Sequence, residues 1–365
     1  MKTVAVFFGG RSVEHDVSVI TGVLTLNSID KTVYQTFPVY VDKSGRWYTG
    51  KALYDIDGYK DLDINKLTEV AMFGGSNSLY AVKWKMLKKL AEISVAVNCM
   101  HGERGEDGTL SGMLNALNIP LASPPVLSSA VCMDKTFTKT VLKGLKIKCL
   151  PSVSVKSVEE WNLIKDKPPL PLIIKPSKLG SSIGIKVAKS EKEVEDAISY
   201  ALRFGDTALI EPCLIDFKEI NCAAYLRPDG SVRVSECERP VGRTQILSFC
   251  DKYEGGKRVF PADISKKSAD KIKKLTEKIY RALGVRGVIR IDYFLVEGEV
   301  FVNEINTVPG SLAYYLFGET LKSFTAMLTE LINVAERDFA KERTFITEYK
   351  SGILFGYGSK GAKRL

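Results

Sequence analysis

Short apolar runs alternate with amphipathic stretches along most of the chain. The apolar runs have the length and β-branched content of strands, and they lie at residues 3–8, 33–41, 94–100, 171–175, 207–211 and 219–226. Stretches with helical spacing lie at residues 110–118, 126–145, 191–205, 264–284 and 321–335. This alternation predicts an α/β protein. A chain of 365 residues is long for one domain, and we expect three units, residues 1–122, 123–211 and 212–365.

The composition narrows the class of protein. Hydrophobic residues make up 45% and charged residues 26% of the chain, as in ordinary globular proteins. No apolar run approaches the roughly 20 residues that span a bilayer, and the start MKTVAVFFGGRS is typical of a strand and turn rather than a signal peptide. The seven cysteines form no CxxC pair, and only two histidines occur. We therefore expect reduced thiols, no zinc site and a cytoplasmic location.

The formal net charge of +9 favours an anionic partner. Lysines are spread along the chain, and no predicted helix carries a basic stripe with interleaved aromatic residues. The last residues, 356–365, form a loose basic end. We therefore expect a small anionic substrate, and neither a nucleic acid nor a membrane as partner.

Two strand-like runs in the last third of the chain carry polar residues two positions apart. Arg290 and Asp292 lie in the first run, and Glu304 and Asn306 lie in the second. Since side chains of a strand alternate between faces, each pair shares a face. If the runs pair through a turn near residues 297–299, three oxygen ligands and one guanidinium converge. Such oxygens suit Mg²⁺ held together with substrate phosphates, whereas a solvated hairpin face is the alternative.

Two glycine-rich segments are candidates for binding polar groups. In residues 173–187, Lys175 ends a strand and Ser181 lies in a Gly/Ser turn whose N–H and hydroxyl groups can cradle phosphate oxygens. No helix follows, so this is not a P-loop, and a plain hairpin turn is the alternative. Residues 98–112 follow a predicted strand and contain His101. Loops at the carboxyl ends of parallel strands are where open α/β sheets bind ligands.

The order of seven motifs gives a more specific prediction. The motifs are GGRSVEHDVS, HGERGEDGTLSG, Met133-Asp134-Lys135, KPSKLGSSIG, DKYEGG, RID and NEINTVPG. In this order, over about residues 3 to 335, they resemble the D-alanine–D-alanine ligases of the ATP-grasp superfamily. The resemblance implies a three-domain ATP-grasp architecture. An N-terminal Rossmann-like substrate domain would precede a central subdomain and a C-terminal α+β catalytic domain with a mobile lid loop, and ATP would be sandwiched between the last two.

The resemblance also implies an activity and its cofactors. The expected enzyme is an ATP-dependent ligase that joins two D-alanines through an acyl phosphate for peptidoglycan synthesis, as a homodimer. ATP and two Mg²⁺ ions, replaceable by Mn²⁺, would be its cofactors. Residues that match the family's ATP contacts are Lys135, Lys175, Glu211, Leu214, Glu219 and Lys252. Residues that match its metal ligands are Asp292, Glu304 and Asn306.

The substrate residues are carried over in the same way. Glu14 matches the residue that receives the ammonium of the first D-alanine, with Ser181 and Tyr253 as its hydrogen-bonded partners. Arg290 and the backbone N–H of Gly310 match the groups that stabilise the tetrahedral intermediate. The second-substrate pocket would be formed by His101, Ser311, Tyr315 and Leu316.

One segment departs from the family pattern. After Pro-Gly the family continues with Met-Thr and then a Ser-Leu pair that contacts the second carboxylate. This chain has SLAYYLF at residues 311–317, so Tyr315 occupies the position of that serine, and Ser311 is the other candidate for its role. A D-alanine–D-serine ligase therefore remains the nearest alternative. A catalytically silent ATP-binding paralogue is the alternative from another class.

Overall fold

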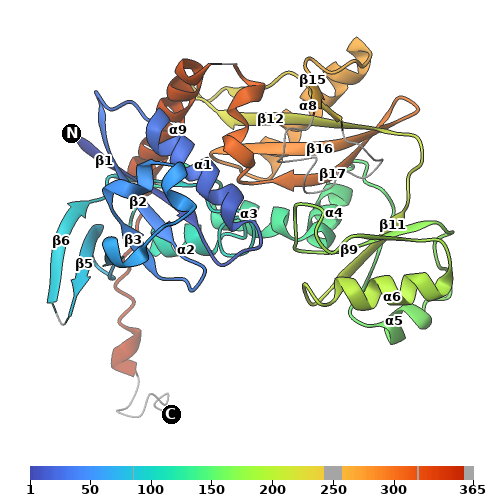
Figure 1. Cartoon of the computed structure of the whole chain (residues 1–365), viewed down its shortest axis with the longest axis horizontal. Helices are drawn as coiled ribbons and strands as arrows, with labels where there is room; N and C mark the ends of the chain where they lie inside the picture. Colours follow the sequence, from blue (N-terminus) through green and yellow to red (C-terminus); the bar gives the residue numbers. More distant parts are fainter. Residues whose placement is uncertain (85, 242–256, 319, 357–365) are drawn as a thin grey trace.

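A computed structural model describes residues 1–84, 86–241, 257–318 and 320–356 of the chain. These described ranges form one seven-stranded sheet, two four-stranded sheets and one two-stranded sheet. Figure 1 shows the N-terminal sheet at the left and the two smaller sheets at the right, with helices packed on each. The mixture of helices and several sheets confirms the predicted α/β class.

The N-terminal sheet has the strand order β6-β5-β4-β3-β2-β1-β7. Its strands are β1 (Lys2–Gly9), β2 (Tyr34–Val41), β3 (Trp47–Thr49), β4 (Thr68–Ala71), β5 (Ser78–Lys83), β6 (Met86–Glu92) and β7 (Val95–Asn98). β1 runs parallel to β2 and to β7. Buried residues of α1 (His15–Ser28) and α9 (Leu321–Glu342) share one core with this sheet, and those of α2 (Thr109–Ala116) share the core on its other face.

The sequence predicted the buried strands of this sheet and missed its outer ones. The expected strands at residues 3–8, 33–41 and 94–100 correspond to β1, β2 and β7. The strands β3 to β6 were not predicted. Nearly all residues of β6 are exposed, so this strand lacks the apolar run by which a buried strand is recognised.

The central sheet has the order β10-β9-β11-β8 with antiparallel pairs throughout. Its strands are β8 (Val153–Val155), β9 (Leu172–Pro176), β10 (Lys186–Ala188) and β11 (Ala208–Pro212). The helices α5 (Val158–Asn162) and α6 (Glu191–Ala201) pack on one side of it (Figure 1). The Gly/Ser-rich segment connects β9 to β10, as expected from its position between two strand-like runs.

The C-terminal sheet has the order β13-β12-β16-β17, again antiparallel. Its strands are β12 (Lys218–Leu226), β13 (Val232–Val234), β16 (Val288–Val296) and β17 (Glu299–Asn306). The helix α8 (Lys266–Ala282) contributes its buried side to the same core. β16 and β17 are joined by Glu297 and Gly298, both at positive φ, which confirms the predicted turn. A separate pair, β14 (Arg239–Val241) and β15 (Lys257–Val259), lies beside this sheet.

The prediction of a single helix over residues 126–145 is wrong. Asp134 is extended, with φ −93° and ψ 108°, and it separates α3 (Val126–Met133) from α4 (Lys135–Gly144). Its carboxylate accepts hydrogen bonds from the N–H of Thr136 at 2.9 Å and from the hydroxyl of Ser177 at 2.6 Å. Asp134 thus caps α4, which the spacing of apolar residues does not reveal. Lys135 becomes the first residue of α4 as a result.

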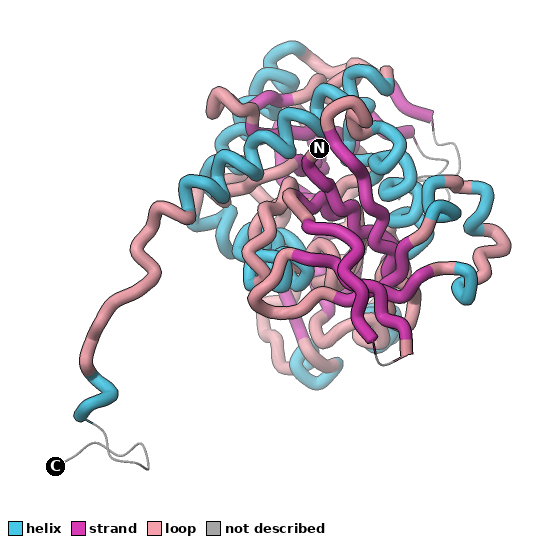
Figure 2. The backbone as a smooth tube through the Cα atoms, turned by 90° about the vertical axis from the view of Figure 1, so that its left-hand side faces the viewer, coloured by secondary structure: helices cyan, strands magenta, loops and turns pink. Residues whose placement is uncertain are grey.

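The last long helix, α9, extends to Glu342 rather than ending near residue 335. Beyond it the chain leaves the body of the molecule, as Figures 1 and 2 both show. Within the described ranges, no helix combines the length and apolarity that would be needed to cross a membrane.

Candidate active site

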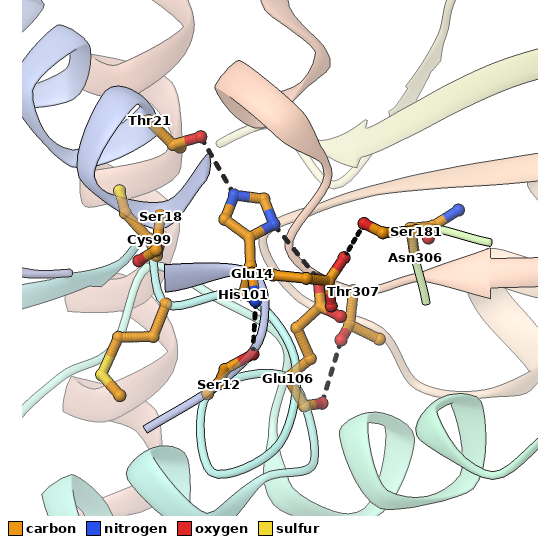
Figure 3. Close-up of polar contacts among 12 residues, drawn as sticks. Ser12, Glu14, Ser18, Thr21, Cys99, His101, Glu106, Ser181, Asn306 and Thr307 are labelled. Carbon is orange, nitrogen blue, oxygen red and sulfur yellow. Dashed lines mark hydrogen bonds and ion pairs between the residues drawn. The ribbon is translucent and has the colours of Figure 1, made fainter. Parts of the chain in front are cut away.

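Loops from three sheets meet around Glu14. This residue follows β1, and His101 follows the parallel neighbour β7. Figure 3 shows both together with Ser181, from the segment between β9 and β10, and Asn306, from the end of β17. The carboxyl ends of two parallel strands therefore contribute to the site, as the sequence predicted.

The carboxylate of Glu14 is buried and partly without a partner. The hydroxyl of Ser181 donates to Oε1, and Oε2 has no hydrogen-bond partner among the described residues. A Cβ atom on Gly102 would lie 3.0 Å from Oε2, and one on Gly180 would lie 3.1 Å from Oε1, so the two glycines keep space open beside the carboxylate. Burial raises the pKa of Glu14, as does nearby Glu106, while Ser181 and His101 lower it. The arrangement suits a small cationic group next to Oε2.

His101 is connected to the segment that follows Gly310. Its Nε2 atom shares a hydrogen bond of 3.0 Å with the hydroxyl of Thr21, which also accepts the backbone N–H of Ser311 at 3.0 Å. On the other side of the ring, Nδ1 lies 3.6 Å from Oε1 of Glu106. Thr21 was not among the predicted site residues, because a single threonine inside a helix carries no distinguishing signal. His101 and Ser311, both predicted, are thus tied together through a side chain that the sequence did not single out.

Lys175, one of the two lysines expected to hold phosphates, lies in a buried cluster with Glu211 and Lys139. Nζ of Lys175 lies 2.6 Å from Oε2 of Glu211, and the ammonium of Lys139 forms an ion pair with the other oxygen of Glu211. Burial raises the pKa of Glu211, but the two lysines outweigh this and hold the pKa below its ordinary value. Nζ of Lys135 donates to the carbonyl of Leu179 at 2.7 Å. Lys139 was not predicted, although it lies one helical turn after Lys135 and so on the same face of α4.

This geometry changes the interpretation of Glu211. The resemblance assigns the residue to nucleotide contact, and its side chain is occupied by the two buried lysines. Its side chain therefore positions Lys175. Glu219 lies on β12 opposite Phe294 of β16. Lys252 and Tyr253 fall outside the described residues.

The hairpin of β16 and β17 brings the predicted metal ligands together. Asp292 lies opposite Glu304, and Arg290 lies opposite Asn306. Nε and Nη2 of Arg290 donate to the two oxygens of Asp292 at 2.7 and 2.9 Å. Nδ2 of Asn306 donates to Oδ2 of Asp292 at 3.2 Å, and Nζ of Lys135 lies 3.6 Å from Oε2 of Glu304. The four predicted residues therefore converge with a phosphate lysine.

The donor set fits a hard cation that is shared with a ligand. Two carboxylates and one amide oxygen are the groups that Mg²⁺ accepts, usually together with substrate phosphates. In the described part of the chain, no cluster of three or more His, Cys, Asp or Glu side chains could hold a metal by itself. An ion at Asp292 and Glu304 could also take oxygens from an anionic ligand, which the nearby lysines are placed to attract.

The segment after Pro309 has an unusual backbone. It forms a 3-10 turn over Gly310–Leu316, in which Ser311, Leu312 and Ala313 have φ values of 51°, 50° and 49°. Left-handed conformations cost energy for residues with a Cβ, so the surroundings must hold this segment in place. Burial raises the pKa of Tyr315, and the positive charge of nearby Arg290 lowers it in part. The predicted pocket residues Tyr315 and Leu316 therefore lie beside the metal-ligand hairpin.

Comparison with known proteins agrees with this geometry. The family model described as D-ala D-ala ligase N-terminus matches residues 3–124, and the one described as D-ala D-ala ligase C-terminus matches residues 150–334. The D-alanine–D-alanine ligase of Thermosipho melanesiensis is 34% identical over 352 residues, which covers 94% of this chain and 96% of the relative. D-alanine–D-alanine ligase A of Escherichia coli is 31% identical over 360 residues, which covers 94% of this chain and 98% of that relative.

Solved structures show the same fold. The D-alanine–D-alanine ligase of Helicobacter pylori is similar with a TM-score of 0.75 and 28% identity, covering 92% of this chain and 98% of that chain. The VanG D-Ala:D-Ser ligase of Enterococcus faecalis has a TM-score of 0.79 and 26% identity, with 92% and 99% covered. By motif order, family models and fold, the chain belongs to the D-alanine–D-alanine ligases, an ATP-dependent ligase family of the ATP-grasp superfamily.

Proposed function

We propose that this enzyme phosphorylates one D-alanine with ATP and joins it to a second D-alanine, giving D-alanyl-D-alanine for peptidoglycan precursors. The observation that carries the proposal is the buried carboxylate of Glu14, whose Oε2 has no partner among the described residues. An ammonium group there would gain a charge-assisted hydrogen bond, which a buried unpaired carboxylate otherwise lacks. The donor amino acid supplies this group.

The donor carboxylate would then face the phosphate lysines. A carboxylate resists attack by an amine because its oxygen is a poor leaving group, and phosphorylation replaces that oxygen by phosphate. Lys175 and Lys135 hold the phosphates, Glu211 and Lys139 fix Lys175, and Lys252 and Tyr253 belong to the lid. Phosphoryl transfer depends mainly on positioning and on neutralising charge, which this lysine-rich surface provides.

Asp292, Glu304 and Asn306 would hold two Mg²⁺ or Mn²⁺ ions together with the phosphates. The bound cations would screen the negative charge of ATP and of the acyl phosphate. Arg290, fixed by Asp292, directs its guanidinium to the reacting carboxyl, and the backbone N–H of Gly310 serves as the second donor. Both donors favour the oxyanion that forms when the second amine attacks.

The second substrate would bind beside His101, Ser311, Tyr315 and Leu316. The names of the relatives favour D-alanine as this substrate. The similarity to a D-Ala:D-Ser ligase keeps D-serine as the competing candidate. Tyr315 takes the place of the family's serine, and its larger ring leaves less room for a bulkier acceptor. An added hydroxyl in a mostly apolar pocket is rejected only about a hundredfold at best, so the preference for D-alanine should be modest.

Other features of the family complete the proposal. The three units comprise residues 1–122, 123–211 and 212–365, with α3 and α4 of the second packing into the core of the third. The enzyme acts as a homodimer in the cytoplasm. The free thiols at residues 99, 132, 149, 213, 222 and 237 are consistent with that location.

Phosphate release and product analysis test the proposal. The enzyme is supplied with ATP and Mg²⁺ and with D-alanine alone, D-alanine plus D-serine, or D-alanine plus D-lactate. Phosphate release with D-alanine alone, together with D-alanyl-D-alanine in the mass spectrum, is the expected result. If D-serine has the higher kcat/KM as second substrate, the D-alanine assignment is wrong. If no mixture releases phosphate while ATP still binds, the chain is a silent paralogue.

A further inference from the structure

A cationic side chain beside the second-substrate segment has no part in the function proposed above. Arg258 lies in β15, opposite Pro240 of β14. Its Cζ atom is 5.0 Å from the ring centre of Tyr315 and 5.3 Å from that of Phe260. Tyr315 and Phe260 pack against the same small apolar cluster. The guanidinium therefore lies against the segment that follows Gly310.

Glu238 holds Arg258 in this position. Nη1 of Arg258 lies 3.3 Å from Oε1 of Glu238, whose side chain is 5% exposed, whereas that of Arg258 is 38% exposed. Glu238 is itself fixed by two backbone hydrogen bonds with Asn221 of β12, at 2.8 and 2.9 Å. A guanidinium carries five N–H donors in a planar fork, and this ion pair uses one terminal nitrogen. With respect to the residues that the structure describes, the partly exposed fork thus keeps donors for a further anion.

The second substrate brings such an anion. Its carboxylate must be held while its amine attacks the acyl phosphate, and the hydroxyl of Tyr315 supplies no charge for this. The nearby cation Arg290 already gives two donors to Asp292. Arginine binds carboxylates in a bidentate fashion, and an aromatic ring beneath the guanidinium favours a fixed plane for the fork. Arg258 combines the charge, the geometry and the place that a carboxylate requires.

We infer that Arg258 binds the carboxylate of the second substrate and thereby restricts that substrate to small α-amino acids with a free carboxylate. The inference rests on the proposed function and deepens it, because it assigns the charged contact that Tyr315 does not provide. The site accepts small amino acids that carry a free carboxylate. It rejects an amine of equal size that lacks the carboxylate.

A competition between two acceptors tests this role. The enzyme receives ATP, Mg²⁺, D-alanine and an equal concentration of D-alaninamide, and the dipeptide and dipeptide amide are quantified by mass spectrometry. The unmodified enzyme should favour the dipeptide, and Arg258→Met should lower the product ratio by about 10- to 100-fold, as expected for loss of a charged hydrogen bond. Because the ratio is compared between variants, differences in amine basicity cancel. The KM for ATP should stay unchanged.

Matched variants separate this role from a structural one. Arg239→Met removes an arginine from the neighbouring strand β14, where its guanidinium contacts Asp263, and should keep the wild-type ratio. Arg258→Lys retains the positive charge without the planar guanidinium. Its ratio of dipeptide to dipeptide amide should lie between those of the unmodified enzyme and Arg258→Met. This variant tests the role of Arg258 if Arg258→Met does not fold. An unchanged ratio in either Arg258 variant overturns the inference while leaving the ligase function intact. Absence of any dipeptide from the unmodified enzyme overturns the proposed function instead.

Discussion

The guanidinium of Arg290 makes two parallel hydrogen bonds to the carboxylate of Asp292, two residues further along β16, at 2.7 and 2.9 Å. Asp292 is buried and Arg290 is mostly buried, and Asp292 also accepts a hydrogen bond from Asn306 of β17. One strand therefore carries both the group proposed to stabilise the oxyanion and the group proposed to face the metal ions. Their relative position is set by the backbone of a single strand.

We expect Arg290→Lys to separate charge from geometry. Lysine keeps the positive charge but loses the fork that Asp292 binds. Turnover should fall by about 10²- to 10³-fold, as for removal of one oxyanion donor. The free energy of unfolding should decrease by about 1–3 kcal/mol, because a charged hydrogen bond to a buried acceptor is lost. Steady-state kinetics and urea denaturation measure the two effects. Wild-type turnover in this variant would contradict the role of Arg290.

We expect Glu304→Gln to abolish most activity while leaving the fold intact. The change removes a carboxylate that lies 3.6 Å from the ammonium of Lys135 and faces the proposed metal site. Turnover should fall by orders of magnitude, and the melting temperature should change little. Glu299→Gln is the matched control on the same strand, since Glu299 forms a surface ion pair with Lys148. Near-normal turnover of Glu304→Gln, measured at saturating Mg²⁺, would remove Glu304 from the ligand set.

Glu14→Gln tests the ammonium site and its pH dependence. The donor KM should rise about 10- to 100-fold through loss of a charge-assisted contact. In the unmodified enzyme the donor KM should rise as the pH falls through the pKa of Glu14, which burial holds above the usual glutamate range. The variant should lack this rise. Identical pH profiles of donor KM for both proteins would argue against Glu14 as the ammonium receptor.

The same substitution should make the ligand-free protein more stable. A raised pKa means that the folded state binds this proton more tightly than the unfolded chain does. The free energy of unfolding therefore falls as the pH rises from the ordinary glutamate pKa through the raised one, and Glu14 destabilises the fold at neutral pH. Melting curves should place Glu14→Gln above the unmodified protein at neutral pH, with the difference shrinking as the pH is lowered. A lower melting temperature at neutral pH would refute this.

Thr21→Val tests the link between His101 and the segment after Gly310. Valine has a similar shape but leaves Nε2 of His101 and the N–H of Ser311 without their shared hydroxyl. The free energy of unfolding should fall by about 1–3 kcal/mol, and kcat/KM for the second substrate should fall more than that for the first. Thr25→Val, one turn later in α1 and equally buried, is the control. Equal effects of the two variants on the second substrate would show that Thr21 has no special role.

Asp134→Ala tests the break between α3 and α4. The change removes the cap of α4 and the acceptor of the Ser177 hydroxyl. Loss of a helix cap should cost about 0.5–2 kcal/mol. The KM for ATP should rise as well, because Lys135 begins the helix that Asp134 caps. A stability loss without any change in the KM for ATP would confine Asp134 to a structural role. Ser190→Ala, which removes the cap of α6, is a matched control for the stability effect alone.

Much of the site followed from local sequence, for a physical reason. In a strand, alternation of side chains is a property of the backbone, so the shared faces of Arg290 with Asp292 and of Glu304 with Asn306 could be predicted before any tertiary contact was known. The turn that pairs their strands was equally local. The order of the motifs indicated the family, and the family implied the fold. In such a fold, the ends of parallel strands bring distant loops together in a defined way.

Tertiary structure decided what depends on contacts between distant segments. Lys139 reaches Glu211, Thr21 reaches Ser311, and Arg258 lies over Tyr315, although each pair is far apart in sequence. The pattern of hydrophobic and polar residues along the chain does not reveal such contacts, because they depend on how separate elements pack. The break at Asp134 was missed for a related reason, since a hydrogen bond from Ser177 on another segment helps to fix it. The sequence by itself determined which residues share a face, and packing determined which faces meet.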